Sequence, residues 1–329
     1  MRAWVCRRFV TPFELEIVDI DVPVPGPGEV RIRVHAAGLA YGETLVLEGR
    51  YQKTPPLPYI PSSEVAGIVD QIGEGVTRVR VGDRVAAFSI ALSGGGLAEF
   101  CIMPERFVHP LPDGVPLATG AGLLMNVWTA FNALYRRGQL ERGETLLVHG
   151  ASGGVGGAAI AVARAMGARV IVTGSDDEKL ALLPADARIN HRTEDVRGRV
   201  LELTGRRGVD VVFDPVGGDL FDASMRVVAP GGRILVVGFT SGRPADARTN
   251  VVLVKMISII GVEARLAIER TDGAGDRDFS EMLRWIAVGR ITVPSPTLLA
   301  FEDAAEGYRR IVARDHIGKL VVAMPAPPL

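Results

Sequence analysis

The segment Thr145-Leu-Leu-Val-His-Gly-Ala-Ser-Gly-Gly-Val-Gly156 joins an apolar, strand-like run to a glycine-rich turn, and an alanine-rich helical stretch follows at once. Glycines let the backbone of such a turn approach a pyrophosphate closely, and the free N–H groups at the start of the helix hold its negative charge. We predict that Gly153, Gly154 and Gly156 make this close approach. A tight turn required only for packing is the alternative.

The chain continues as an alternation of strands and helices, which is typical of an α/β fold with a doubly wound parallel sheet and right-handed crossovers. The predicted strands are Thr145–His149, Arg169–Thr173, Val209–Asp214, Arg233–Phe239 and Ser258–Glu263. The predicted helices are Gly154–Met166, Asp177–Leu182, Val196–Leu203 and Gly218–Val227.

The flanking regions have a different pattern. Residues 1–110 alternate short apolar runs with Gly and Pro, which predicts a mostly β unit, and residues 121–134 are helical in composition. The predicted strands of the β unit are Val30–His35, Val65–Ile72, Arg84–Phe88 and Ala98–Met103. Towards the C-terminus we predict helices at Phe279–Val288 and Phe301–Ala313 and strands at Ile291–Pro296 and Lys319–Met324. We expect this C-terminal piece to return to the β unit.

Length and charge narrow the class of protein. A chain of 329 residues suggests about two domains, and a net charge of −1 gives no broad basic field for nucleic acid or an anionic membrane. The longest apolar runs are shorter than the ~20 residues of a membrane-spanning helix, and the opening residues do not resemble a signal peptide. Cys6 and Cys101 are too few for a disulfide framework. We therefore expect a cytoplasmic globular protein.

The residues that follow the second predicted strand of the α/β region, Arg169–Thr173, indicate whether NADH or NADPH is bound. NAD-binding versions of the motif place an acidic residue there, which accepts hydrogen bonds from the ribose 2′-OH. Here the strand ends in Gly174-Ser175, so that Gly174 leaves room for a 2′-phosphate, and Ser175 and Lys179 offer it hydrogen bonds. We predict NADPH as the cofactor. In the alternative, Ser175 caps the helix, Lys179 is solvated, and Asp176 or Asp177 serves NADH.

Further segments resemble the zinc-independent quinone oxidoreductases of the medium-chain dehydrogenase/reductase superfamily, the group that includes zeta-crystallin. The resemblance covers nearly the whole chain. Besides the glycine turn it rests on Pro25-Gly-Pro-Gly-Glu-Val30, Ala37-Gly-Leu-Ala-Tyr41, Gly49-Arg-Tyr-Gln52, Pro58-Tyr-Ile-Pro-Ser-Ser-Glu-Val-Ala-Gly67, Val79-Arg-Val-Gly-Asp-Arg-Val85, Asp214-Pro-Val-Gly-Gly218, Gly231-Gly-Arg-Ile-Leu-Val-Val-Gly238, Ile259-Ile-Gly-Val262 and Gly318-Lys-Leu-Val321.

The resemblance implies a GroES-like, mostly β catalytic domain and a Rossmann NADP(H)-binding domain, with the cofactor in the cleft between them. We place the first domain at residues 1–122 with 264–329, and the second at residues 123–263. Members of the family are commonly homodimers, and the resemblance implies the same here.

The resemblance also implies which residues hold the cofactor. Tyr51 and Thr129 would lie near it, Ser152, Gly153, Gly154 and Val155 at the pyrophosphate, and Gly174, Ser175 and Lys179 at the 2′-phosphate. His191 takes the place where relatives have Tyr or His beside the adenosine. The residues on the nicotinamide side would be Gly217, Phe239, Thr240, Gly261, Val262 and Glu263.

No metal is expected. Zinc-dependent relatives place a Cys near position 40 and Gly-His-Glu at positions 62–64, where this chain has Ala40 and Ser62-Ser63-Glu64. Ala40 and Ser63 cannot replace Cys and His as zinc ligands. The five histidines show no ligand spacing either: they are His35, His109, His149, His191 and His316.

Without a metal ion to act as a Lewis acid, hydride transfer is still possible when the nicotinamide is held against an electron-poor acceptor, such as a quinone. The polar candidates for orienting such a substrate are Tyr41, Tyr51, Gln52 and Asn126. Ala40 stands where relatives usually carry an Asn near the nicotinamide, so the choice of substrate can differ from theirs.

Three functions agree with these features. The first is an NADPH-dependent quinone oxidoreductase. The second is an NADPH-dependent reductase of α,β-unsaturated carbonyls, either enones or enoyl thioesters. The third is a non-enzymatic NADPH-binding protein, and the near-zero net charge argues against strong RNA binding by it.

Overall fold

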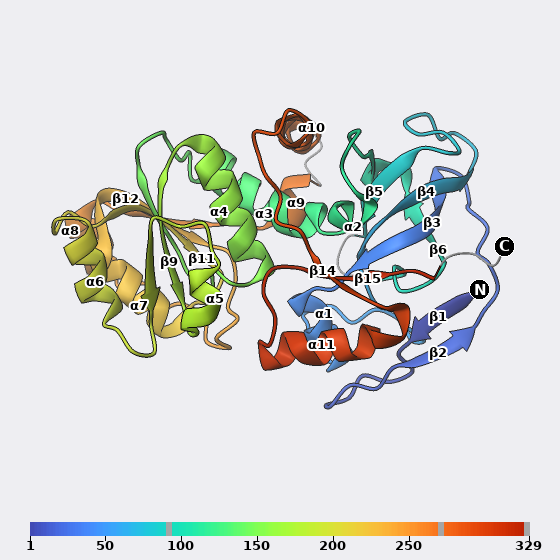
Figure 1. Ribbon diagram of the computed structural model, residues 1–329, viewed down its shortest axis with the longest axis horizontal. Helices are drawn as coiled ribbons and strands as arrows, with labels where there is room; N and C mark the ends of the chain where they lie inside the picture. Colours follow the sequence, from blue (N-terminus) through green and yellow to red (C-terminus); the bar gives the residue numbers. More distant parts are fainter. Residues whose placement is uncertain (90–93, 269–272, 326–329) are drawn as a thin grey trace. The chain divides into compact units, whose positions relative to one another are not determined.

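The computed structural model describes residues 1–89, 94–268 and 273–325, which form two compact units. Unit 1 comprises Met1–Met125 and Ser295–Leu329, and unit 2 comprises Asn126–Pro294. Figure 1 shows the elements of each unit.

Unit 2 is built on a six-stranded parallel sheet with the strand order β10-β9-β8-β11-β12-β13. Its strands are β8 (Thr145–Val148), β9 (Arg169–Gly174), β10 (Ala187–Asn190), β11 (Val209–Asp214), β12 (Val228–Val236) and β13 (Ser258–Gly261). Its helices are α3 (Trp128–Phe131), α4 (Gly154–Met166), α5 (Asp177–Ala181), α6 (Val196–Leu203), α7 (Gly218–Val227), α8 (Thr249–Lys255), α9 (Ala264–Ile268) and α10 (Ala274–Ala287). Two π-helical turns, η3 (Leu123–Val127) and η4 (Asn132–Arg137), flank α3.

The central strands β8 and β11 are largely buried on both faces, as their apolar residues require, whereas β13 at the edge is partly exposed. Every residue of β8 is buried, and Ile171, Val212 and Ile234 of the neighbouring strands join one hydrophobic core with Phe221 of α7. Figure 1 shows α4 on one side of the strands and α6, α7 and α8 on the other. This arrangement follows from right-handed crossovers that run in opposite directions from β8.

The direction of the crossovers changes between β8 and β11. From β8 the chain moves to β9 and β10 on one side, and then crosses to β11, β12 and β13 on the other. In sheets of this kind, ligands bind beyond the carboxyl ends of the strands at the point where the order reverses. Unit 2 therefore places the glycine-rich turn after β8 at its expected ligand-binding edge.

Unit 1 contains a mostly antiparallel sheet with the order β14-β15-β3-β4-β5-β7, in which β6 pairs with β3, and a separate β1-β2 pair. Its strands are β1 (Arg2–Val5), β2 (Glu16–Asp19), β3 (Glu29–Gly38), β4 (Glu64–Ile72), β5 (Arg84–Phe88), β6 (Phe100–Pro104), β7 (Val108–Pro110), β14 (Thr297–Leu299) and β15 (Leu320–Ala323). Its helical elements are α1 (Tyr41–Leu47), η2 (Glu105–Phe107), α2 (Leu117–Gly120), η5 (Phe301–Asp303) and α11 (Ala304–Ala313).

The C-terminal part of the chain returns to unit 1. Strand β15 pairs antiparallel with β3, and β14 pairs parallel with β15. Helix α11 packs its buried face, including Tyr308 and Ile311, into the core of this unit. Unit 1 is therefore discontinuous in sequence.

The division into units differs from the predicted one at residues 123–125, which group with unit 1, and at residues 264–294, which group with unit 2. The cause of the second difference is aromatic packing within unit 2. Phe279 of α10 lies 5.5 Å from Trp128 between ring centroids, and Trp285 packs edge-on against Phe131 at 5.3 Å. Residues 269–272 and 326–329 of the predicted segment lie outside the described residues.

Some local predictions also differ from the structure. The predicted strand Ile291–Pro296 is irregular, and the strand of this region is β14, which begins at Thr297. Strand β10 was not predicted, because only its partner β9 identifies this four-residue segment as a strand. No described helix is long and apolar enough to cross a membrane.

A buried ion pair joins the C-terminal segment to the rest of unit 1. Nζ of Lys319 lies 2.8 Å from Oε2 of Glu64, and the two side chains are 8% and 1% exposed. Oε1 of Glu64 accepts hydrogen bonds from the backbone N–H groups of Leu124 (2.5 Å) and Met125 (2.9 Å). The Glu64 carboxylate is thus fully engaged without contact to water.

Replacing Lys319 should destabilise unit 1 strongly. In Lys319→Met the buried Glu64 carboxylate loses its cationic partner, which costs about 3–5 kcal/mol of unfolding free energy. The measurement is urea unfolding, with Arg309→Met at an exposed ion pair as the matched control, for which less than about 1 kcal/mol is expected. Adding Glu64→Gln to Lys319→Met should recover part of the loss. A loss no larger than that of the control would contradict this account.

Candidate functional site

The glycine-rich turn of unit 2 runs from the end of β8 to Gly153, the residue before α4. Its backbone closes on itself, since the N–H of Gly153 donates to the carbonyl oxygen of Gly150 at 3.1 Å. A Cβ on Gly156 would lie 2.7 Å from the Cα of Ala151, so only glycine permits this close packing. The first N–H groups of the 13-residue helix α4 have no acceptor within the helix and form a suitable anion site.

The amide of Asn126 lies beside the start of α4. A Cβ on Gly154 would overlap Nδ2 of Asn126, and the Asn126 side chain is only 8% exposed. The structure therefore brings this predicted residue to the predicted pyrophosphate residues Ser152–Val155, which are all partly buried. Thr129 lies on α3, three residues further along, and is partly buried as well.

The end of β9 is organised by packing. Gly174 is buried, and a Cβ there would lie 2.9 Å from Cδ2 of Leu180. Close packing against Leu180 is thus a second reason for a glycine here, beside the room predicted for a 2′-phosphate. The carbonyl oxygen of Gly174 accepts a hydrogen bond from the N–H of His191 at 3.0 Å, which brings these two predicted residues together.

The cap of α5 bears on one part of the alternative interpretation, in which Ser175 caps the helix. Asp176 is the N-cap, and its Oδ1 accepts a hydrogen bond from the backbone N–H of Lys179 at 3.0 Å. Ser175 therefore does not cap the helix as the alternative supposed. Asp177 is exposed in the first turn of α5, while Ser175 and Lys179 are partly buried.

A second turn follows β11 and contacts the segment after β12. Oδ1 of the buried Asp214 accepts hydrogen bonds from the N–H groups of Val216 (2.8 Å) and Gly217 (2.9 Å). Gly217 has φ +71°, and a Cβ there would lie 3.0 Å from Cδ1 of Phe239. The N–H of Thr240 donates to the carbonyl oxygen of Pro215 at 3.1 Å. The predicted residues Gly217, Phe239 and Thr240 therefore form one cluster.

Asp214 is a site residue that sequence reasoning missed. Its carboxylate orders the turn that carries Gly217, and the signal for this role is an Asp-Pro pair at the end of a predicted strand.

The last predicted cofactor residues follow β13. The N–H of Val262 donates to the carbonyl oxygen of Val236 at the end of β12, at 2.9 Å. Gly261 and Glu263 are exposed on either side of it. All predicted cofactor residues from Ser152 onwards thus lie at or just beyond the carboxyl ends of the strands of unit 2, except Lys179, which lies in the helix after β9.

Three predicted residues belong to unit 1. Tyr41 is the first residue of α1 and is 39% exposed, and Gln52 is exposed. Tyr51 is partly buried and packs against the core of this unit. Their aromatic and amide groups are thus held on a rigid unit at or near its surface.

The positions that hold zinc in related enzymes are occupied by a hydrogen-bonded cluster. The buried carboxylate of Glu43 accepts hydrogen bonds from the N–H groups of Ala40 (3.1 Å) and Ser63 (2.5 Å) and from the Tyr308 hydroxyl (2.7 Å). Burial raises the pKa of Glu43, and the bond from Tyr308 opposes this shift. Among the described residues, no group of three or more His, Cys, Asp or Glu side chains could hold a metal ion. These residues do not fit a zinc ion.

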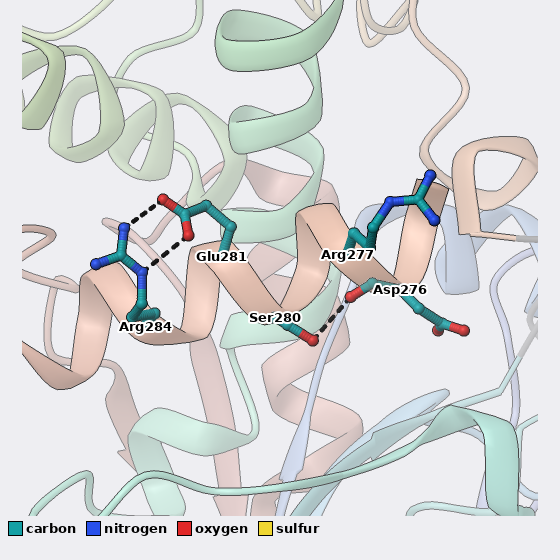
Figure 2. A pocket seen from close by; sticks show the side chains of 5 residues that line it. All are labelled: Asp276, Arg277, Ser280, Glu281 and Arg284. Atoms are coloured by element: carbon teal, nitrogen blue, oxygen red, sulfur yellow. Dashed lines mark hydrogen bonds and ion pairs between the residues drawn. The ribbon is translucent and has the colours of Figure 1, made fainter. Parts of the chain in front are cut away.

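One surface depression lies along α10 and is separate from these clusters. Figure 2 shows its lining side chains, which all come from this helix: Asp276, Arg277, Ser280, Glu281 and Arg284. Arg284 pairs with Glu281 at 2.6 Å, and the Ser280 hydroxyl donates to the carbonyl oxygen of Asp276 at 2.8 Å. None of the predicted site residues lines it.

Two family models match the chain. Residues 26–113 match the alcohol dehydrogenase GroES-like domain, and residues 154–287 match the zinc-binding dehydrogenase domain. The first match lies in unit 1 and the second in unit 2. The fold is thus a GroES-like domain combined with a Rossmann-like domain, as predicted.

Individual relatives agree with these matches. The chain is 33% identical to quinone oxidoreductase-like protein 2 of Rattus norvegicus, over 98% of this chain and 92% of the relative. The structure of Escherichia coli quinone oxidoreductase complexed with NADPH superposes with a TM-score of 0.89 at 26% identity, covering 98% of this chain and all of that one. The CurK enoyl reductase superposes with a TM-score of 0.85 at 25% identity, over 98% and 99% of the two chains. The chain belongs to the quinone oxidoreductase family of the medium-chain dehydrogenase/reductase superfamily.

Proposed function

We propose that this protein is an NADPH-dependent quinone reductase that works without zinc. The observation that carries the proposal is the edge of unit 2, where the glycine-rich turn, the end of β9 and the Gly217 turn follow neighbouring strands of one parallel sheet. This arrangement suits an extended dinucleotide across the point where the strand order reverses. The structure of the related Escherichia coli quinone oxidoreductase contains NADPH, which supports the proposed cofactor.

The choice of NADPH over NADH rests on α5. Asp176 binds the helix backbone as N-cap, so its Oδ1 is engaged and less suited to accept from a ribose 2′-OH. Ser175 and Lys179 offer a hydroxyl and an ammonium group to a 2′-phosphate. A phosphate is held best by charge-assisted hydrogen bonds of this kind. The proposal therefore assigns Gly174, Ser175 and Lys179 to the 2′-phosphate, and His191 to the adenosine.

The remaining assignments divide the cofactor between two clusters. Ser152, Gly153, Gly154 and Val155 would hold the pyrophosphate through backbone N–H groups at the start of α4. The nicotinamide side would be lined by Gly217, Phe239, Thr240, Gly261, Val262 and Glu263. Phe239 is 44% exposed and offers an aromatic face for this purpose. When bound, NADPH supplies the two electrons that reduce a quinone to a hydroquinone.

Unit 1 and the start of unit 2 supply the proposed substrate-orienting groups. We assign this role to Tyr41, Tyr51, Gln52 and Asn126, with Tyr51 and Thr129 also near the cofactor. A quinone needs little further help, because its reduced oxygens can take protons from water. No metal is required in this scheme, which agrees with the poor fit of Ala40, Ser63 and their neighbours to zinc.

The similarity to the CurK enoyl reductase favours one second candidate function, reduction of enones or enoyl thioesters. Such a substrate develops negative charge on its carbonyl oxygen, which a hydrogen-bond donor would have to stabilise. Ala40 has no side-chain donor. We therefore expect quinones to be better substrates than enones.

We also propose that the protein is a homodimer joined through β13 and α8. Leu253, Val254 and Met256 are 78%, 81% and 80% exposed. Beside them lies β13, the last strand in the sheet order, and no described strand pairs with its outer edge. The strand carries neither Pro nor charge, which suits antiparallel pairing with a second copy about a twofold axis. The Arg137 side chain donates to the carbonyl oxygen of Gly261 at 3.2 Å, so pairing at this residue would replace that bond.

Lys179→Ala should raise the KM for NADPH about tenfold or more and leave the KM for NADH nearly unchanged. The reason is the loss of a charge-assisted bond to the 2′-phosphate, worth about 1.5–3 kcal/mol. Steady-state kinetics with both cofactors provide the measurement, and Arg197→Ala at an exposed position of α6 is the control for loss of a positive charge. Equal increases for both cofactors would argue against the assignment.

Turnover of 1,4-benzoquinone should exceed that of a small enone at equal NADPH concentration, after subtraction of the uncatalysed rate. The physical reason is that the quinone needs no enzyme group to stabilise an oxyanion. Absorbance of NADPH gives both rates directly. Faster enone turnover would instead support the second candidate function, and binding of NADPH without turnover of either would contradict both.

Light scattering should give a mass of twice the 35.1 kDa chain mass. Leu253→Glu with Met256→Glu should convert the dimer to monomers, because burying two unpaired carboxylates in the interface is unfavourable. Val24→Glu, at an exposed apolar residue of unit 1, is the control and should leave the mass unchanged. A wild-type monomer, or a dimer that survives the double substitution, would contradict this interface.

A further inference from the structure

His149 is a buried histidine that neither the glycine turn nor the proposed chemistry uses directly. It follows β8, and its side chain is completely buried. Nδ1 of its ring lies 2.8 Å from Oγ1 of Thr173, and Nε2 lies 2.7 Å from Oγ of Ser224. The ring thus bridges the end of β9 and the middle of α7.

The hydrogen-bond partners define which nitrogen carries the proton. The Ser224 hydroxyl donates its one hydrogen to the carbonyl oxygen of Leu220 at 2.8 Å, so towards His149 it acts as an acceptor. Nε2 therefore carries the hydrogen, and Nδ1 accepts the hydrogen of the Thr173 hydroxyl. Burial lowers the pKa of His149 to about 4, against an opposing effect of the Asp214 carboxylate, so the ring is neutral at pH 7. Every polar atom of the bridge is satisfied in this one arrangement.

The bridge connects the segments that the proposed function assigns to the two phosphate groups of the cofactor. His149 directly precedes the glycine-rich turn, and Thr173 directly precedes Gly174 and Ser175. A backbone bond runs in parallel, from the N–H of Ala151 to the carbonyl oxygen of Thr173 at 3.1 Å. The turn and the end of β9 are therefore held together by a side-chain contact as well as a backbone contact.

We propose that His149 is a positioning residue: its bond to Thr173 sets the separation between the glycine turn and Ser175, and thereby the preference for a 2′-phosphorylated dinucleotide. The inference rests on the proposed function. The pyrophosphate and the 2′-phosphate belong to one ligand at a fixed spacing, so both are bound well only when the two protein segments match that spacing. Hydrogen bonds weaken steeply with misalignment. A dinucleotide without the 2′-phosphate has no anchor at Ser175 and tolerates a change in the spacing.

The test compares affinities for the two cofactors in Thr173→Val and His149→Gln. Thr173→Val keeps the shape of the side chain but removes the hydroxyl that donates to Nδ1. His149→Gln keeps an N–H donor that can reach Ser224 but has no acceptor at the position of Nδ1, where the Thr173 hydroxyl donates. We expect the ratio of the Kd for NADH to the Kd for NADPH, measured by fluorescence titration, to fall about fivefold or more in both variants.

The matched control is Thr204→Val at the C-cap of α6 in the same unit. Its hydroxyl donates to the carbonyl oxygen of Val200 at 2.7 Å, far along the chain from the proposed phosphate residues. The control should leave the ratio within about twofold of the wild type, while thermal unfolding monitors the stability of all variants.

The outcomes separate this inference from the proposed function. A wild-type protein that fails to prefer NADPH would contradict the proposed cofactor, whatever the variants do. A wild-type preference that persists in Thr173→Val and His149→Gln, or an equal loss of affinity for both cofactors, would overturn the positioning role. Should one variant fail to fold, the other carries the test, because each breaks the same bond from a different side.

Discussion

The close approach of the backbone at the glycine-rich turn is the constraint on which unit 2 depends. Gly156 packs so tightly against Gly150 and Ala151 that any side chain there would collide with backbone atoms. This contact lets α4 start directly above the end of β8 and lie against the sheet. The same geometry leaves the first N–H groups of α4 without partners in the helix. Packing and anion binding are thus two results of one turn.

Much of unit 2 could be predicted because local sequence features determine where its helices and strands begin and end. Helices α4, α6 and α7 and strand β11 have the predicted bounds. Asp195 caps α6 through the N–H groups of Arg197 and Gly198, and such caps can be recognised in a sequence. Strand β10 and the grouping of residues 264–294 depend on distant partners, and no local pattern specifies those partners.

The same holds for the site: its place in the fold could be predicted, but the contacts of its individual residues could not. The sequence order of strands and helices was enough to predict that residues far apart in the chain gather at one edge of the sheet. It was not enough to identify the neighbours of each residue. Gly174 packs closely against Leu180, which depends on how α5 turns back on β9, and Asp176 rather than Ser175 caps α5, although either residue type can cap a helix. In unit 1, Glu43 holds Ser63 and Ala40 in a contact that only the fold brings about.

The discontinuity of unit 1 has a consequence for synthesis of the chain on the ribosome. Unit 2 is one continuous segment and can fold as soon as it has emerged, since domains generally fold as units. Unit 1 emerges first, and its strand β3 can pair with β4 and β6, but residues 36–38 of β3 lack their second partner until β15 has been made. Until then the carboxylate of Glu64 is without Lys319, and the edge of β3 is open to other strands. The part of the protein that is made first is therefore completed last, and it is the part most exposed to misassembly on the way.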